Sequence, residues 1–197
     1  MARDSRLMGG DPVVDLELVE AMVAELEDYI IKNDVYRTLI VRTSQGDENI
    51  RMTGGDLLAR LHRLQGERDA LTPAQQARLD AAQKAAETTI YSLRTRFHQR
   101  LQREMKARLD SLRWFLDDCR SDLQRCRTEF PFEMRNRQRI EEILKELGQN
   151  VPSELTDLLR QIDKRIKEVA NEQGFTWDER LEKVYPRDTY WYLYVRP

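Results

Sequence analysis

The stretch from residue 72 to residue 130 constrains the fold most, because nothing in it obliges a helix to stop. It holds no glycine, and no proline separates Pro73 from Pro131. Thr72 and Pro73 suit the N-cap and the first helical position, and Gln75 completes a capping box. The sequence therefore predicts one helix that begins at Pro73 and ends shortly before Pro131, whose ring disfavours a helical conformation in the preceding residue.

The apolar residues of this helix, predicted over residues 73–128, form a stripe along it. From Leu109 to Phe130 they recur at alternating steps of three and four, a heptad pattern typical of a coiled coil. Such a helix spans about 84 Å, whereas a compact chain of this size has a radius of gyration of about 16 Å. We therefore expect the helix to project from its globule and its stripe to be covered by a second copy. The residues expected at this oligomer contact are Ile90, Leu93, Phe97, Leu101, Leu109, Leu112, Leu116, Cys119, Leu123 and Cys126.

Shorter elements are predicted on both sides of the long helix. Before it, Asp11 and Pro12 begin a helix that runs to about Lys32, residues 36–52 alternate as a β-hairpin, and Asp56 is the N-cap of a second helix. After it, two further helices are predicted, over residues 133–147 and from Pro152 to Gly174, followed by an aromatic segment suited to a third strand of the hairpin. The predicted fold is mainly α, an elongated helical bundle or coiled coil built on one long helix. It forms one domain over residues 1–197, divided into 12–70, 73–128 and 133–197.

The two cysteines are predicted to be small core residues. Cys119 and Cys126 lie seven positions apart on the expected helix, which would separate their Cα atoms by about 10.5 Å. That distance is too long for a disulfide between them.

No motif in the sequence identifies an enzyme, a metal or a cofactor. There are two histidines, and no metal-binding His-Glu pair, phosphate-binding loop or nucleophile motif is present. Catalysis by carboxylates alone, for example Asp117 and Asp118, stays a third interpretation. The Gly54-Gly55-Asp56 turn resembles a site where backbone amides bind an anion, but the Asp56 carboxylate would compete for those amides.

Two surfaces are candidates for binding. A basic face on the long helix comprises Arg94, Arg96, Arg100, Arg103 and Lys106. The C-terminal aromatics form either a cover for the core or a platform for a partner protein, and the platform would comprise Trp177, Tyr190, Trp191, Tyr192 and Tyr194.

These observations predict a non-enzymatic helical scaffold or adaptor that associates with itself and with a protein partner. The net charge of −2 opposes general binding to nucleic acid, so a nucleic-acid-associated protein that uses the basic face is the alternative. A membrane-surface helical bundle is a second alternative. No run approaches 18 apolar residues and Met1–Gly10 have no apolar core, so we expect no membrane span, no signal peptide and a cytoplasmic location.

Overall fold

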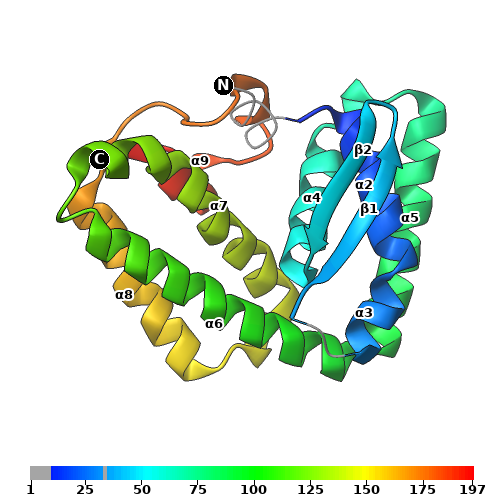
Figure 1. Cartoon of the computed structure of the whole chain (residues 1–197), viewed down its shortest axis with the longest axis horizontal. Coiled ribbons are helices and arrows are strands. Elements are labelled where there is room, and N and C mark those ends of the chain that lie inside the picture. The colour runs from blue at the N-terminus through cyan, green and yellow to red at the C-terminus, as the bar shows by residue number, and fades with distance from the viewer. Residues whose placement is uncertain (1–9, 33–34) are drawn as a thin grey trace. The chain divides into compact units, whose positions relative to one another are not determined.

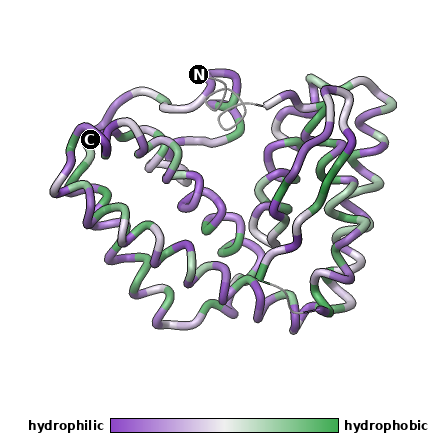
Figure 2. Tube along the Cα trace, viewed as in Figure 1, coloured by the Kyte–Doolittle hydropathy of each residue, from purple (hydrophilic) through white to green (hydrophobic). Residues whose placement is uncertain are grey.

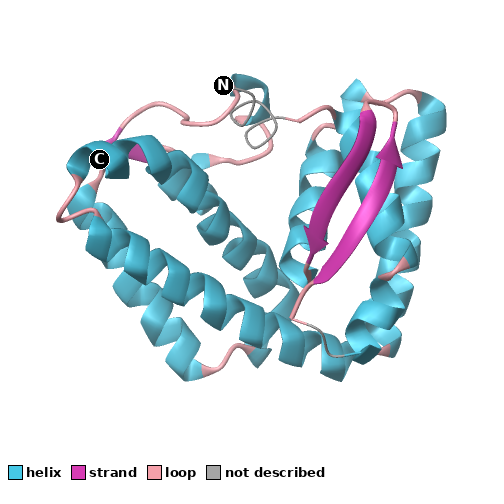
Figure 3. Ribbon diagram, viewed as in Figure 1, coloured by secondary structure: helices cyan, strands magenta, loops and turns pink. Residues whose placement is uncertain are grey.

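The computed structural model describes residues 10–32 and 35–197 and is mainly helical (Figure 3). Its described residues form eight α-helices and a small antiparallel hairpin, which confirms the predicted class. They divide into two compact units, residues 10–104 and 105–197, and the single elongated domain stays a prediction. The prediction that the N-terminus lacks a signal peptide falls on residues 1–9, outside the described part. Within the described ranges, no helix is long and apolar enough to cross a membrane.

The unit of residues 10–104 is built around one central helix, α2. This helix contacts α4, α5 and β1, and the hairpin lies over it with α4 and α5 on either side (Figure 1). Its elements are α2 (Pro12–Ala24), α3 (Leu26–Lys32), β1 (Arg37–Thr43), β2 (Gly46–Met52), α4 (Gly54–Gly66), the 3₁₀ turn η1 (Arg68–Ala70), α5 (Pro73–Ser92) and the first turns of α6 (Arg94–Asp118).

The hairpin has the predicted position, and a two-residue loop closes it. β1 and β2 pair antiparallel with Thr43 opposite Gly46, and Gly46 has a φ of 122°, which favours glycine. The loop is tied to the start of α2, because the backbone N–H and the hydroxyl of Ser44 both donate to Glu17 Oε2, at 2.9 and 3.1 Å. The hairpin is therefore fixed at its tip as well as along its inner face.

The unit of residues 105–197 is a set of three helices covered by the C-terminal segment. Three contacts show that α6 and α7 lie side by side. Cys119 is bonded to Cys126, and the Phe115 and Phe130 rings are 6.3 Å apart. Arg108 donates to Asn136 at 2.8 Å. Because the numbers rise on one helix as they fall on the other, α6 and α7 are antiparallel. The elements that follow α6 are α7 (Leu123–Leu147), η2 (Gly148–Asn150), α8 (Ser153–Val169), β3 (Asn171–Glu172), η3 (Glu179–Leu181), α9 (Arg187–Tyr190), η4 (Trp191–Leu193) and β4 (Val195–Arg196).

The expected single helix over residues 73–128 is not formed, because the chain leaves helical geometry twice. Leu93 has φ −116° and ψ 24°, so α5 ends at Ser92 and α6 begins at Arg94. Residues 119–122 form a turn that contains neither glycine nor proline. Figure 2 shows hydrophobic and hydrophilic residues alternating along the helices, so the stripe was a sound signal for helices but did not reveal the turn.

The predicted break at Phe130-Pro131-Phe132 is also wrong, since Pro131 lies inside α7. Proline removes one helical hydrogen bond and costs a helix about 3 kcal/mol. Phe130 and Pro131 are both buried, so apolar packing offsets that cost. Helix α7 therefore begins ten residues before the predicted start at residue 133.

Most helix ends follow local rules, with two exceptions, one of which is that α8 ends at Val169 and not at the predicted Gly174. Asp11, the Thr72–Gln75 capping box and Gly148 all act as predicted at their helix termini. The predicted N-cap Asp56 is wrong, because Thr53 holds that position and accepts from the Asp56 N–H at 3.2 Å.

The C-terminal aromatic run does not join the hairpin. Residues 187–193 form the short helical turns α9 and η4, and β4 pairs only with β3, as Asn171 opposite Arg196 and Glu172 opposite Val195. The third-strand prediction is therefore wrong. The predicted docking of this segment is correct, since Tyr190, Tyr192 and Leu193 are almost fully buried.

Candidate functional site

The apolar stripe proposed for oligomer contact lies mostly inside the chain. Eight of its ten residues, Ile90, Phe97, Leu101, Leu109, Leu112, Leu116, Cys119 and Cys126, are buried. Leu93 is half-buried and Leu123 is 52% exposed. The chain itself therefore covers the stripe, and the argument that a second copy must cover it no longer holds. Self-association stays a prediction.

The basic face does not form one surface. Arg100 is buried, its guanidinium carbon lies 4.3 Å from the centre of the Tyr29 ring, and its Nε donates to the Ile30 carbonyl at 3.3 Å. Lys106 lies in the other unit and pairs with Asp110 one helical turn away. Arg94, Arg96 and Arg103 are exposed. A continuous row of cations along a helix is therefore not available to phosphates.

The aromatic platform is mostly a cover for the core. Tyr190, Tyr192 and Tyr194 are buried, and the half-buried Trp177 donates its indole N–H to the Pro131 carbonyl at 2.9 Å. The ring of Trp191 is half-buried and carries Lys167 Nζ 4.7 Å from its centre. These contacts favour the first of the two interpretations, a segment that closes the core.

The N-terminus of α4, the candidate anion site, is filled by a carboxylate of the same unit. Glu104 accepts from the Gly55 N–H at 2.9 Å and from the Thr53 hydroxyl at 2.7 Å, while the Gly54 N–H donates to the Tyr29 hydroxyl at 3.2 Å. The Glu104 carboxylate therefore already occupies this site, where an anion interacts with the helix dipole and the amide N–H groups.

Asp117 and Asp118 make separate contacts. Asp117 accepts from Arg165 of α8 at 2.6 Å, whereas the backbone carbonyl of Asp118 accepts from the Ser121 hydroxyl at 2.9 Å in the turn after α6. These contacts therefore give no geometric support to catalysis by the two carboxylates alone. Among the described residues, no group of three or more His, Cys, Asp and Glu is arranged to hold a metal ion.

An ionic cluster of buried Glu142 and Tyr190 with the exposed Lys145 joins α7 to the C-terminal turns. Tyr190 donates to Glu142 Oε1 at 2.6 Å, and Lys145 donates to Glu142 Oε2 at 3.1 Å. Burial, and then the hydrogen bond to Glu142, raises the pKa of Tyr190 above its ordinary value. Tyr190 therefore stays neutral, and the cluster fastens the aromatic segment to α7.

Arg137 is the buried cation of the same helix. It donates to both carboxylate oxygens of Asp163, at 2.8 and 3.1 Å, and to Glu141 at 2.9 Å, and it lies 4.6 Å from the centre of the Tyr192 ring. Burial alone would lower the pKa of Arg137, but the Asp163 hydrogen bonds raise it above its ordinary value. Arg137 is thus fully used in holding α7, α8 and the C-terminal turns together.

The cysteines form a disulfide, which corrects the prediction of two separate thiols. Cys119 and Cys126 are bonded, with their Cα atoms 4.9 Å apart. The separation expected in a continuous helix was about 10.5 Å, and the turn at residues 119–122 removes that distance. The bond closes the tip of the α6–α7 hairpin.

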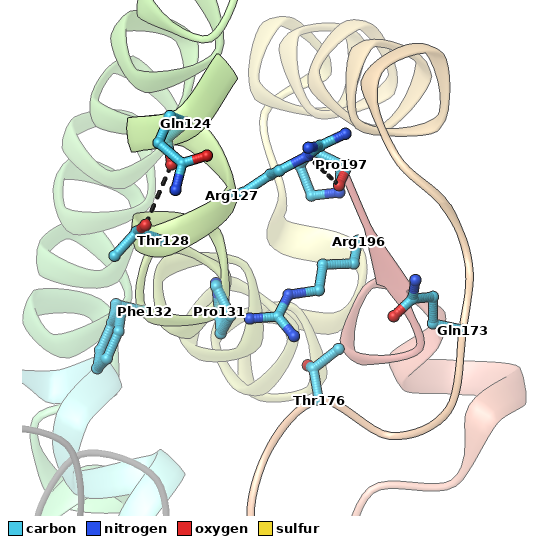
Figure 4. Close-up of a pocket in the computed structure, with 9 residues that line it drawn as sticks. All are labelled: Gln124, Arg127, Thr128, Pro131, Phe132, Gln173, Thr176, Arg196 and Pro197. Carbon is cyan, nitrogen blue, oxygen red and sulfur yellow. Dashed lines mark hydrogen bonds between the residues drawn. The ribbon is translucent and has the colours of Figure 1, made fainter. Parts of the chain in front are cut away.

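A pocket of about 680 Å³ lies in the unit of residues 105–197 (Figure 4). Three segments that are distant in sequence form it: the first turns of α7, the chain that follows α8, and the end of the sequence. Its lining residues are Gln124, Arg127, Thr128, Pro131, Phe132, Gln173, Thr176, Arg196 and Pro197. The lining thus contains two arginines and no aspartate or glutamate side chain.

The arginines of the pocket differ in their contacts. Arg127 Nε donates to the main-chain oxygen of Pro197, the last residue of the sequence, at 3.1 Å. Arg196 is anchored through its backbone to Asn171, and its guanidinium extends toward Pro131 in Figure 4 without a hydrogen bond or an ion pair to any described residue. Thr128 and Thr176 both donate their hydroxyls to backbone carbonyls, at 3.1 and 2.9 Å. The charge available to a ligand is therefore that of Arg196, with Arg127 beside it.

Sequence reasoning did not identify Arg127 and Arg196 because nothing local distinguishes them from the other arginines. Their pocket depends on the turn at residues 119–122 and on the docking of the C-terminal segment, and both are tertiary features. The one local signal nearby, Pro131, indicated the end of a helix. No protein-family model, no curated protein and no solved structure matches this chain.

Proposed function

We propose that this protein is a non-enzymatic adaptor that acts through protein–protein contacts, and that its pocket binds an acidic segment of a partner. The observation that carries the proposal is Arg196, a guanidinium without a partner among the described residues, inside a pocket lined by no Asp or Glu side chain. An arginine can bind a carboxylate or a phosphate through two parallel hydrogen bonds. The volume of about 680 Å³ falls within the range of ligand pockets.

The walls of the pocket favour a polypeptide over a nucleic acid. Pro131, Phe132 and Pro197 supply apolar surface, and Gln124 and Gln173 supply amides that can pair with a peptide backbone. A nucleic acid would need a row of cations, and the buried Arg100 and the paired Lys106 interrupt the row on α6.

The lining also supports binding over catalysis. It contains no His, Cys, Lys, Asp or Glu side chain, which are the groups that most often transfer protons or attack a substrate. The two threonine hydroxyls already donate to the backbone. The role that remains for these side chains is to bind and orient an anionic group.

Fluorescence anisotropy tests the proposal with a labelled octapeptide library whose two central positions are Glu, beside a matched library with Gln. We expect the Glu library to bind, and Arg196→Ala to weaken it about tenfold or more, since a charge-assisted hydrogen bond contributes roughly 1.5–3 kcal/mol. Arg160→Ala is the matched control, because Arg160 is an exposed arginine of the same unit outside the lining. Equal binding of both libraries, or an unchanged Arg196→Ala, would overturn the proposal. Tighter, strongly salt-dependent binding of a labelled single-stranded DNA would favour the nucleic-acid alternative.

Two finer features remain proposals. Self-association can be tested by mass photometry at micromolar concentration. A monomeric mass would contradict it. The cytoplasmic location is in tension with the Cys119–Cys126 disulfide, because such bonds persist mainly in oxidising compartments and are transient or regulatory in the cytosol.

A further inference from the structure

We propose that the Cys119–Cys126 disulfide is a redox clip that holds the first turns of α7, and with them one wall of the arginine pocket. Its effect on ligand binding rests on the proposed function, but its effect on α7 does not. Cys126 lies in the first turn of α7, between the pocket residues Gln124 and Arg127. The bond is thus part of the segment that supplies the pocket.

The two cysteines are the only buried side chains from Asp117 to Glu129. Leu123, the one large apolar residue between them, is 52% exposed. Few apolar contacts therefore hold this segment against the rest of the unit. Segments with few buried contacts open at low free-energy cost, so the covalent bond is the main restraint on this one.

The other restraints on the segment are weak and exposed. The Asp122 carboxylate accepts from the Arg125 N–H at 2.9 Å as an N-cap, a contact that contributes about 1 kcal/mol. Arg125 and Glu129 form an exposed ion pair, and such pairs contribute little. Arg127 donates to the main-chain oxygen of Pro197 from an exposed position.

The same segment has a second conformation available in its sequence. Residues 117–130 contain no glycine and no proline and carry an apolar heptad pattern, which favours a continuous helix. A continuous helix would separate the two Cα atoms by about 10.5 Å, whereas the disulfide holds them at 4.9 Å. The bond is therefore incompatible with that conformation. Its reduction removes the covalent restraint on the present turn, so that residues 119–128 can open locally.

The redox step is an exchange with a dithiol reductant. One thiolate of the reductant attacks the sulfur of Cys119, the more exposed of the two at 6% against 1%, and Cys126 leaves as a thiolate that takes a proton. The second thiol of the reductant then attacks the mixed disulfide and releases Cys119 as a thiol. Two electrons and two protons pass to the protein, and the reductant becomes a cyclic disulfide.

Hydrogen exchange measured by mass spectrometry tests the clip on the full chain, before and after treatment with dithiothreitol. Because the chain has two cysteines, both in this bond, the reductant acts at one site. We expect faster exchange of amides 123–128, unchanged exchange in α4 and α5, and about tenfold weaker binding of the Glu library. The double variant Cys119→Ser/Cys126→Ser should match the reduced protein and should not respond to dithiothreitol.

The possible outcomes distinguish the effect of the disulfide on α7 from its effect on ligand binding in the pocket. If reduction leaves hydrogen exchange unchanged, the proposal of a redox clip is wrong. It is also wrong if reduction unfolds the whole unit cooperatively, because the disulfide would then stabilise the unit in general. Faster local exchange with unchanged peptide affinity would overturn control of the pocket. If the oxidised protein binds neither peptide library, the proposed function fails, while the exchange data still decide whether the clip exists.

Discussion

The N-terminus of α4 in one unit and the pocket around Arg196 in the other use a charged side chain in different ways, and the difference indicates where a binding site lies. In residues 10–104 the anion-binding end of α4 meets Glu104 of the same unit. In residues 105–197 the buried Arg137 is equally well paired, but Arg196 faces a pocket without a partner among the described residues. A charge that the fold already pairs contributes to structure, whereas the exposed guanidinium of Arg196, without a partner among the described residues, is available to a ligand.

The largest expected effect concerns the paired arginine of the second unit. Arg137→Ala would leave Asp163 and Glu141 without their cation and should lower the free energy of unfolding by about 3 kcal/mol. Urea denaturation followed by tryptophan fluorescence measures the loss. Arg160→Ala, which removes only an exposed pair, should change stability by less than about 0.5 kcal/mol. If the two variants lower the free energy of unfolding equally, the distinction between a charge that stabilises the fold and a charge that is available to a ligand would be wrong.

The next effect concerns the close contact that brings α4 onto α6. A Cβ atom at Gly54 would lie 2.8 Å from Leu101 Cδ2 and 3.0 Å from the Phe97 ring. Gly54→Val should therefore destabilise the protein by about 2 kcal/mol through overpacking. Gly174→Ala is the control, because nothing lies within 4 Å of its added Cβ. Circular dichroism during urea denaturation compares them, and a Gly54→Val variant as stable as Gly174→Ala would contradict the crowding.

The third effect comes from removal of the Glu104 carboxylate, which tests whether this side chain occupies an anion site at the N-terminus of α4. Glu104→Ala deletes the acceptor of Thr53 and Gly55 and should cost about 1–2 kcal/mol. The vacated helix end should then bind an anion. We expect sulfate to raise the melting temperature of Glu104→Ala more than that of the wild type, with Glu104→Gln in between. An equal sulfate response in all three proteins would show that Glu104 does not occupy an anion site.

The smallest effect is a pH dependence at Glu133 of α7. Burial raises the pKa of Glu133 above its ordinary value of 4.5, partly opposed by the Asn136 hydrogen bond. The folded chain therefore holds this proton more tightly, so stability falls as pH rises from the ordinary pKa through the raised one. Glu133→Gln should be more stable than the wild type at pH 7, by under about 0.5 kcal/mol, and should lose that advantage below pH 4. Denaturation midpoints across that range measure the difference, and parallel pH profiles would contradict it.

Local chemistry made several features of the fold predictable from the sequence. The Asp11 cap, the Thr72–Gln75 capping box and the left-handed Gly148 each depend on a few adjacent residues. The hairpin was predictable for the same reason, because alternation and a glycine at the turn determine its register.

The features that failed depend on distant residues. The turn at residues 119–122 has no turn signal in its composition, and it is fixed by the disulfide and by helix packing such as that of Phe115 on Phe130. Pro131 is tolerated within α7 because its surroundings bury it. The pocket combines both of these features with the docked C-terminus, so no local pattern around Arg196 could have revealed it.

The docking of Trp177 on the Pro131 carbonyl has a practical consequence for spectroscopy. Trp177, Trp191 and Trp114 are the three tryptophans of the chain, and all of them lie in the unit of residues 105–197. Indole emission is therefore a site-selective reporter of that unit, whereas far-ultraviolet dichroism sums the helices of both. Two denaturation curves that coincide would mean that the units unfold cooperatively, and two that separate would give each unit its own melting transition.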